Sequence, residues 1–226
     1  MEKPIAVFDL DSTLLEGDCE LMWVKYIAHK GLVDQDFLKT IAHYMDEYKN
    51  GSIDYVEYEK FAFSPLQQNK NVNLKEFLAE YLKEIERLFR PYMLKRVENH
   101  RRQGYTLLLA SASNSFVVQP IAQLLNIPNI VCSWLEMKDG CPTGNLLGAA
   151  SFREGKAKNV KTWVESHPVT LKESWGYSDS HTDLPILKLV QHPVAVTPDA
   201  KLRQYAQQQG WEIIEKPAVP ADTLLD

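Results

Sequence analysis

Residues 6–18 read AVFDLDSTLLEGD. The run begins with apolar residues typical of a buried strand and then places two carboxylates, Asp9 and Asp11, one residue apart. The Ser12-Thr13 pair that follows predicts that the strand turns into a loop here. Two acids this close repel each other, so their burial is costly unless a cation or a proton lies between them. Bound Mg²⁺ would relieve the repulsion, whereas a solvated turn that contains two acids is the alternative interpretation.

Composition limits the classes of protein that the chain can represent. Its 226 residues are 45% hydrophobic, enough for one large domain or for one domain with an insertion. The net charge of -5 argues against a nucleic-acid or anionic-membrane partner. Cys19, Cys132 and Cys141 are widely spaced without CxxC or zinc-ligand spacing, which favours free thiols in a reducing compartment. With no apolar run of about 20 residues and no signal-peptide core, we expect a globular cytoplasmic protein, monomeric or homodimeric.

Short apolar runs alternate with segments of helical period along most of the chain. The predicted strands are 5–8, 106–110, 175–177, 194–197 and 211–214, and the predicted helices are 116–125, 156–165, 184–189 and 200–208. This alternation predicts an α/β fold with a Rossmann-like parallel sheet flanked by helices, in which ligands bind outside the carboxyl ends of the strands. A β-hairpin at the sheet edge is predicted over 131–149, and the last residues, 216–226, are predicted to fray.

The stretch 17–96 breaks the alternation and reads as helices throughout, which predicts an inserted helical cap domain. The core domain would then comprise 1–16 and 97–226. A turn is predicted at Asn50-Gly51. Many of the chain's aromatic residues fall in the insert, and they either form its own small core or line a pocket in part: Trp23, Tyr44, Tyr48, Tyr55, Tyr58, Phe61 and Phe63.

Polar side chains follow several of the predicted strands. In a parallel sheet these strand ends meet at one edge, so we expect the following residues to converge with Asp9 and Asp11: Ser111, Lys156, Asp179 and Asp183. A hydroxyl, an ammonium and four carboxylates suit phosphoryl transfer, which depends on positioning and charge neutralisation. Taken singly, Lys156 also fits a solvated lysine at a helix start and Ser111 a cap at a strand end.

Four ordered motifs carry a family resemblance. DLDSTL, a strand ending in Ser, GKxK and SDxxxDLP resemble those of the haloacid dehalogenase superfamily, in particular its phosphoserine-phosphatase-like branch, subfamily IB. The match spans nearly the whole chain. The resemblance implies that Asp9 is the nucleophile that forms an aspartyl-phosphate and that Asp11 is the general acid-base. It also implies that Ser111 binds phosphate and that Lys156 offsets charge on the nucleophile and the phosphoryl group.

The same resemblance implies a Mg²⁺ cofactor and a closing cap. Asp179 would hold the metal together with Asp9 and the backbone carbonyl of Asp11, while Asp183 would support the site from behind. The helices of 17–96 would correspond to the cap that closes over the substrate.

The substrate is expected to be a small phosphorylated metabolite. In phosphoserine-specific relatives a glutamate near the first motif meets the substrate amine; Asp18 holds that position here, and Glu20 follows. Their cap arginine, which binds the substrate carboxylate, falls near Ala62, where Lys60 is the only cation nearby. We therefore expect an amine-bearing alcohol phosphate such as histidinol phosphate.

Other functions remain open at this point. They are a phosphoserine phosphatase, a phosphotransferase to an alcohol acceptor, and a catalytically silent protein that binds a phosphorylated metabolite. A dehalogenase has no use for a leaving-group acid such as Asp11. Ser113 lacks the GxSxG context of a serine nucleophile, and His181 is expected in a surface loop.

Overall fold

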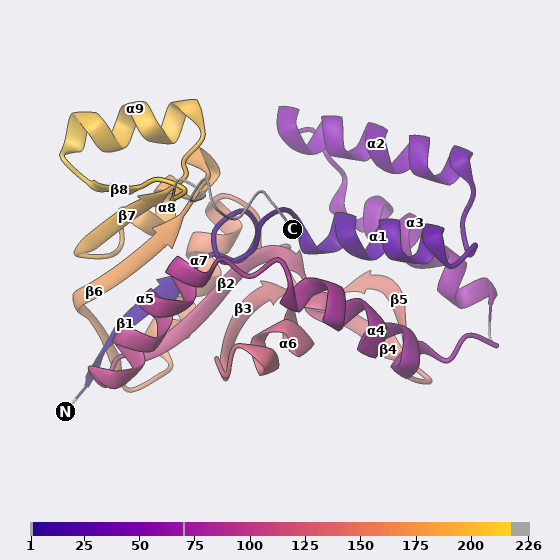
Figure 1. The fold of residues 1–226 in the computed structure, drawn as a ribbon, viewed down its shortest axis with the longest axis horizontal. Coiled ribbons are helices and arrows are strands. Elements are labelled where there is room, and N and C mark those ends of the chain that lie inside the picture. Colours follow the sequence, from indigo (N-terminus) through magenta and orange to yellow (C-terminus); the bar gives the residue numbers. More distant parts are fainter. Residues whose placement is uncertain (1, 70, 218–226) are drawn as a thin grey trace, which may run out of the picture.

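A six-stranded parallel sheet forms the centre of the computed structural model, which describes residues 2–69 and 71–217 (Figure 1). The strand order is β3-β2-β1-β6-β7-β8, and each neighbouring pair runs parallel. The strands are β1 Lys3–Phe8, β2 Thr106–Asn114, β3 Asn129–Ser133, β6 Val169–Ser178, β7 His192–Val196 and β8 Glu212–Ile214. The predicted α/β fold is confirmed. Strand β3 was not predicted as a separate strand, because its residues 131–133 fall within the predicted hairpin.

Strand β1 lies inside the sheet because its side chains are apolar on both faces. Ala6 and Phe8 belong to one hydrophobic cluster, and Ile5 and Val7 belong to another. All four are at most 2% exposed. Such two-sided burial is typical of a strand covered by helices on both faces of a parallel sheet. Asp9 is therefore the first polar side chain beyond the carboxyl end of β1.

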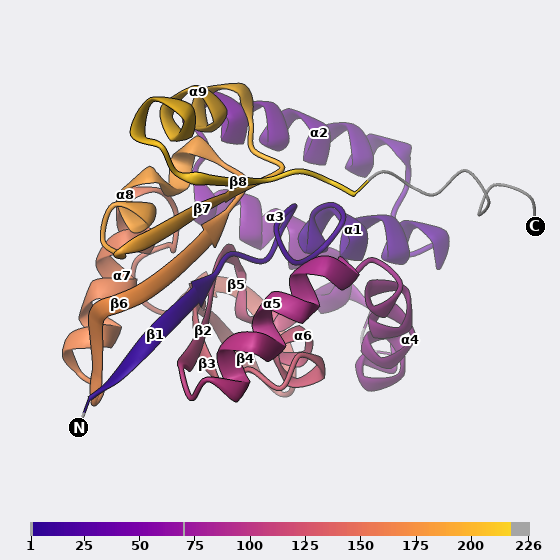
Figure 2. The same cartoon turned by 60° about the vertical axis from the view of Figure 1, so that its left-hand side comes forward.

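Helices cover both faces of this sheet (Figure 2). On the face of Ala6 and Phe8 lie α5 Pro91–Arg102 and α6 Ser115–Leu124. On the opposite face lie α7 Glu154–Glu165 and α8 Leu184–Leu187, preceded by a 3₁₀ turn at His181–Asp183, and α9 Ala200–Gln209 packs on β7. The first turn of α7 thereby comes close to the end of β1.

The insert is helical, as predicted, with α1 Cys19–His29, α2 Gln35–Asn50, α3 Tyr55–Gln68 and α4 Leu74–Glu86. Each of these helices begins after a residue whose side chain accepts a hydrogen bond from a backbone N–H of the first turn: Asp18, Asp34, Asp54 and Asn73. The predicted turn at Asn50-Gly51 is the end of α2, where Gly51 adopts a left-handed conformation with φ 78°.

The aromatic residues of the insert divide between two packing environments. Tyr58, Tyr44 and Phe61 pack with Ile41 in a cluster that belongs to the insert alone. Trp23 and Phe63, in contrast, join the main cluster beneath the sheet and contact Phe116 of α6. The expectation that the insert has its own core thus holds for the first group only, because α1 and α3 also pack on the core domain.

The hairpin is confirmed, but its predicted place at the edge of the large sheet is wrong. Strands β4 Leu135–Lys138 and β5 Cys141–Leu146 form a separate antiparallel sheet, which packs on α3 of the insert. A Cβ on Gly144, whose φ is +80°, would lie 2.5 Å from the Lys60 Cα. Gln67 Nε2 also donates to the Thr143 carbonyl oxygen at 2.7 Å. The hairpin therefore packs on α3 instead of extending the edge of the large sheet.

The predicted boundary between 96 and 97 falls inside a continuous helix. Helix α5 runs from Pro91, and its Met93 and Val97 belong to the main cluster beneath the sheet. Proline is common at the first position of a helix, because the backbone N–H that proline lacks would have no partner within the helix there. We propose that the core domain resumes at Pro91 and that the cap ends before it.

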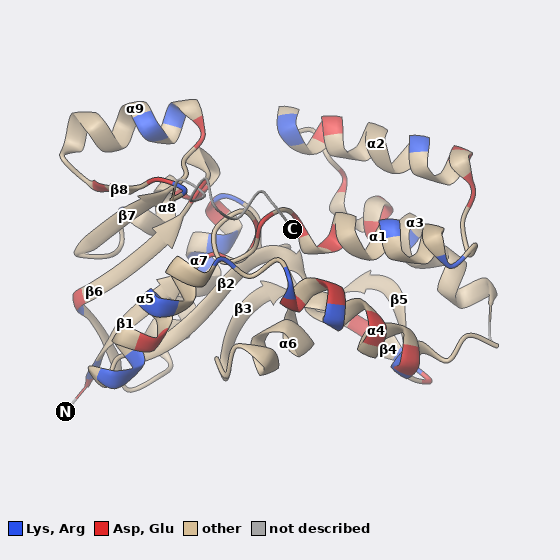
Figure 3. Cartoon of the chain, viewed as in Figure 1, with Lys and Arg blue, Asp and Glu red and all other residues tan. Residues whose placement is uncertain are grey.

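Surface features follow the composition. Figure 3 shows acidic and basic residues interspersed along α2, α4 and α5 rather than gathered on one basic face. Cys19, Cys132 and Cys141 are free thiols. Within 2–69 and 71–217, every helix is too short or too polar to cross a membrane. Apart from Lys216 and Pro217, the segment predicted to fray lies outside the described residues.

Candidate active site

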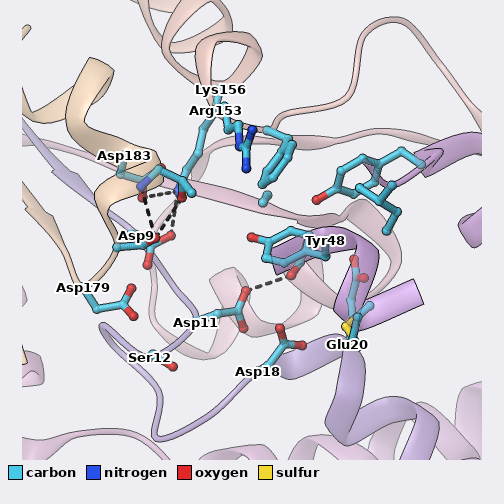
Figure 4. A pocket seen from close by; sticks show the side chains of 18 of the residues that line it. Asp9, Asp11, Ser12, Asp18, Glu20, Tyr48, Arg153, Lys156, Asp179 and Asp183 are labelled. Carbon is cyan, nitrogen blue, oxygen red and sulfur yellow. Dashed lines mark hydrogen bonds and ion pairs between the residues drawn. The ribbon is translucent and has the colours of Figure 1, made fainter. Parts of the chain in front are cut away.

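A cavity of about 190 Å³ lies at the carboxyl edge of the sheet, between β1, β6, the first turn of α7 and the inserted helices (Figure 4). Its lining includes the predicted residues Asp9, Asp11, Asp18, Lys156, Asp179 and Asp183. Ser111 is the predicted residue that does not line it. Side chains that join the lining without having been predicted as site residues include Glu20, Tyr48, Ser113, Phe152 and Arg153. The structure thus brings together residues spread from position 9 to position 183.

Lys156 connects two carboxylates at the base of the cavity. Its Nζ donates to Asp9 Oδ1 and to Asp183 Oδ2, both at 2.7 Å, and its side chain is almost fully buried. Burial opposes the charge, but Asp183 and Asp9 hold the pKa of Lys156 well above its ordinary value, so the ammonium stays charged. Asp183 also accepts a hydrogen bond from Ser178 Oγ at 2.8 Å. Asp183 therefore fixes Lys156, and Lys156 fixes one oxygen of Asp9.

Asp9 and Asp179 carry more negative charge than Lys156 can balance. Thr13 Oγ1 lies 2.8 Å from Asp9 Oδ2 and 3.3 Å from Asp179 Oδ1, so one hydroxyl reaches both carboxylates. Burial raises the pKa of Asp9 to about 7, with Asp183 and Asp11 adding to the rise against the attraction of Lys156. Burial, Asp9 and Asp183 raise the pKa of Asp179 to about 8. This electrostatic environment is one that a bound cation would relieve.

The donor set here suits Mg²⁺. The ion takes oxygen ligands, usually one or two carboxylates completed by other oxygens and water. Asp9 and Asp179 are two such carboxylates at one point of the cavity. Among the described residues, three or more His, Cys, Asp or Glu side chains nowhere gather into a set that could hold a metal by themselves. A metal held by Asp9 and Asp179 would therefore need further ligands of another kind, such as a backbone carbonyl or water.

The carboxylate of Asp11 is held on the other side of the Asp9 loop. Its Oδ1 accepts the backbone N–H of Cys19 at 2.7 Å, and its Oδ2 accepts Ser113 Oγ at 2.8 Å and Ser111 Oγ at 3.2 Å. Ser111 is fully buried within β2, and its Oγ also accepts the Ser113 N–H at 3.1 Å. Ser113, two residues on along the same strand, lines the cavity, whereas Ser111 does not. The two serines together orient Asp11.

An acidic end of the cavity lies where the insert meets β2. Glu20 accepts hydrogen bonds from the Asn114 N–H and, at 3.1 Å, from Tyr58 OH. Glu59 is fully buried behind it and accepts from Asn114 Nδ2 at 3.1 Å. Burial with repulsion from Asp11 raises the pKa of Asp18 to about 7, and burial raises that of Glu59 to about 8. Burial, together with Glu59 and Asp18, also raises the pKa of Glu20.

Several residues that line the cavity lie outside the sequence motifs and could not be predicted from them. Tyr48, Tyr55 and Tyr58 line the cavity from α2 and α3. Their helical spacing is equally compatible with a position in the core of the insert, so it did not identify them as cavity residues. Arg153 lines it from the segment just before α7. Its nearness to the GKxK motif is the one signal in the sequence that could have drawn attention to it. His181 lies half-buried against Asp199, outside the lining.

Comparison with known proteins places this geometry in a family. The family model for haloacid dehalogenase-like hydrolases matches residues 6–188. A protein of Neisseria meningitidis called histidinol-phosphatase is 37% identical over 219 residues, which cover 94% of this chain and 98% of that protein. The matched region contains all of the residues that bring carboxylates, lysine and serines to the cavity.

Solved structures agree on the fold. A crystal structure of a Bordetella pertussis protein of unknown function is 31% identical, with a TM-score of 0.85, and covers 95% of this chain and 99% of its own. A substrate-bound phosphoserine phosphatase has a TM-score of 0.68 at 17% identity and covers 95% of this chain and 93% of its own, a likeness of fold. The chain belongs to the haloacid dehalogenase-like hydrolase family, as its ordered motifs predicted.

Proposed function

We propose that this phosphatase hydrolyses the phosphate monoester of a small alcohol that carries a cationic group, with histidinol phosphate as the leading candidate. The observation that carries the proposal is the polarity of the cavity. Asp9 and Lys156 occupy one end, and Asp18 and Glu20 occupy the other. A phosphorylated alcohol with a protonated amine would match both ends. The Neisseria meningitidis relative called histidinol-phosphatase supports this choice.

In the proposed reaction Asp9 attacks phosphorus in line with the leaving alcohol. A bond forms between an Asp9 carboxylate oxygen and phosphorus while the ester P–O bond breaks, and Asp11 gives its proton to the departing oxygen. Asp11 then takes a proton from water, which attacks the aspartyl-phosphate and releases inorganic phosphate and free Asp9. Lys156 keeps one Asp9 oxygen fixed at 2.7 Å through these steps. Asp183 is assigned a positioning role, because it contacts Lys156 rather than the reacting atoms.

We also propose Mg²⁺ as the cofactor, which members of this family generally use. Asp9, Asp179 and the backbone carbonyl of Asp11 would hold it. When bound, the ion supplies positive charge to the phosphoryl oxygens. Burial and the neighbouring carboxylates raise the pKa values of Asp9 and Asp179, and a cation held between them would offset both effects, which supports this assignment. Ser113 is the better candidate for a hydroxyl that meets the phosphate, because Ser111 is fully buried.

Phosphoserine is the second candidate substrate, and Arg153 is the observation in its favour. The cap arginine of phosphoserine-specific relatives has no counterpart near Ala62, but Arg153 brings a guanidinium into the cavity from the core domain. A carboxylate on the substrate would find a cation there.

The three free cysteines are consistent with the proposed cytoplasmic location.

The test is release of inorganic phosphate from histidinol phosphate, phosphoserine and 4-nitrophenyl phosphate, with Mg²⁺ and with EDTA. We expect turnover only with Mg²⁺, the highest kcat/KM for histidinol phosphate, and loss of turnover in Asp9→Asn. Turnover by Asp9→Asn would refute the assigned nucleophile. Phosphorylation of added glycerol in place of phosphate release would show a phosphotransferase, and tight binding without turnover would show a silent protein.

A matched pair of variants tests the acidic end. Asp18 and Asp34 both accept a first-turn backbone N–H, at 2.9 Å each, and asparagine caps helices as well as aspartate does. Asp18→Asn should raise KM for histidinol phosphate but not for 4-nitrophenyl phosphate, because only the former has a cation to lose. Asp34→Asn should change neither. Equal effects of the two variants would contradict the proposed role of Asp18.

A further inference from the structure

Arg153 is a cavity residue that the reaction described above does not use. We propose that its guanidinium binds the phosphate group of the substrate, as a second cationic donor beside Lys156. The inference rests on the phosphatase activity of the proposed function, but it does not depend on which ester is the substrate.

The donors of Lys156 are largely committed already. An ammonium has three N–H donors, and Asp9 and Asp183 accept two of them at 2.7 Å each. At most one donor is left for a phosphate that presents several acceptor oxygens. The guanidinium of Arg153 has five donors, and within 2–69 and 71–217 no carboxylate or carbonyl accepts from it. Its free fork matches a phosphate group in shape and charge.

Arg153 also lines the cavity that contains Asp9 and Lys156. It precedes α7 by one residue, three positions before Lys156, and both side chains line the same cavity. Figure 4 shows the two side chains entering the cavity from the same side. Lys156 contacts Asp9, and Asp9 must meet phosphorus. A second cation that enters the cavity from the side of Lys156 is therefore a candidate donor to the phosphoryl oxygens.

The guanidinium lies against Phe152 of the core and next to Gly51 at the end of α2. Its Cζ lies 4.9 Å from the centre of the Phe152 ring, and Phe152 packs on Tyr48 of α2 at 4.8 Å between ring centres. A Cβ on Gly51 would lie 2.4 Å from both terminal nitrogens of Arg153, so the absence of a side chain there leaves room for the guanidinium. Arg153 itself has φ 50° and ψ -123°, a backbone conformation that costs energy in a residue with a side chain. The structure thus holds Arg153 in a strained backbone conformation.

The test uses inorganic phosphate as the probe, with the full-length protein and Mg²⁺. Arg153→Gln should weaken phosphate binding, measured by calorimetry and as product inhibition, by about ten- to hundredfold, the effect expected for losing hydrogen bonds to a charged group. KM should rise by a similar factor for every ester tested, and Arg153→Lys should recover part of the loss. Lys158→Gln, on the exposed side of α7, should leave binding and KM unchanged.

A second pair of variants moves Arg153 without replacing it. Gly51 and Gly210 both end a helix in the left-handed conformation, with φ 78° and 68°, but a Cβ on Gly210 would meet nothing within 4 Å. Both alanine variants carry the same backbone strain. Only Gly51→Ala should weaken phosphate binding, because only its Cβ displaces the guanidinium.

Two results would overturn the inference. One is phosphate binding by Arg153→Gln within twofold of wild type, with circular dichroism showing an intact fold. The other is a KM that rises for phosphoserine alone, which would make Arg153 a carboxylate site. If the wild type hydrolyses none of the esters, the proposed function fails, yet the phosphate titration still decides the role of Arg153.

Discussion

Glu59 offers a test of the acidic end through stability rather than turnover. It is fully buried, and its carboxylate accepts hydrogen bonds from Asn114 Nδ2 at 3.1 and 3.2 Å. Among the described residues no lysine, arginine or histidine forms an ion pair with it. Glu59→Gln keeps the shape and removes the charge. Asn114 Oδ1, which is buried without a hydrogen-bond partner in the described part of the chain, is a candidate acceptor for the new amide.

The magnitude follows from the pKa of Glu59, which burial raises from 4.5 to about 8. Because the folded state favours the protonated form, the stability from neutral Glu59 is fully present below pH 4.5 and is lost as the pH rises towards 8. At 1.36 kcal/mol for each pH unit, the ionised carboxylate costs on the order of 3–5 kcal/mol above pH 8. We expect Glu59→Gln to be more stable than wild type by that amount at pH 9 and within about 0.5 kcal/mol of it near pH 4.5.

Urea denaturation at a series of pH values measures this difference. The matched control is Glu57→Gln, in the same helix, whose side chain is 61% exposed and should show no such pH dependence. A Glu59→Gln variant that is less stable than wild type at pH 9, or whose stability falls with pH as steeply as that of wild type, would refute the account of the acidic end.

Three further predictions concern the metal, the hairpin and a buried histidine. Mg²⁺ should raise the Tm of the wild type relative to EDTA but not that of Asp179→Asn, and equal shifts would contradict the assigned ligand. Gly144→Ala should lower the free energy of unfolding, measured by urea denaturation, by about 2–3 kcal/mol, because its Cβ would lie 2.5 Å from the Lys60 backbone. Gly140→Ala is the control, because Gly140 also has a positive φ, +79°, but has open space around it, and its loss should be smaller. Equal losses would exclude the close approach as the cause. Burial lowers the pKa of His100 to about 4, so NMR titration should show a neutral ring down to that pH. The contribution of neutral His100 to stability should be lost only as the pH falls from 6.5 towards 4. A titration midpoint near 6.5 would be inconsistent with this burial.

The sheet and the base of the cavity were predictable because short-range patterns determine them. An apolar run before Asp9, the GKxK segment and the SDxxxDLP segment each fix where a side chain leaves its strand or helix. Parallel topology then forces those positions onto one edge. The register of β1 with β2 and β6 confirms that argument, since Phe8 lies opposite Leu109 and Tyr177.

The residues contributed by tertiary packing were not predictable in this way. Ser111 and Ser113 lie on one strand, and only the structure shows which of them reaches the cavity. Glu59 has the sequence context of a surface residue between Tyr58 and Lys60, yet it is completely buried where α3 meets Asn114 at the end of β2. The place of the hairpin also depended on a long-range contact, the approach of Gly144 to α3.

The most direct test of the central claim compares two esters under identical conditions with Mg²⁺. They are histidinol phosphate and the same ester without its amino group, measured as kcat/KM for phosphate release. Because Asp18 and Glu20 would lose a charge-assisted partner, we predict a kcat/KM about ten- to hundredfold higher for histidinol phosphate. Equal values for the two esters would contradict the claim that the acidic end of the cavity selects a cationic substrate.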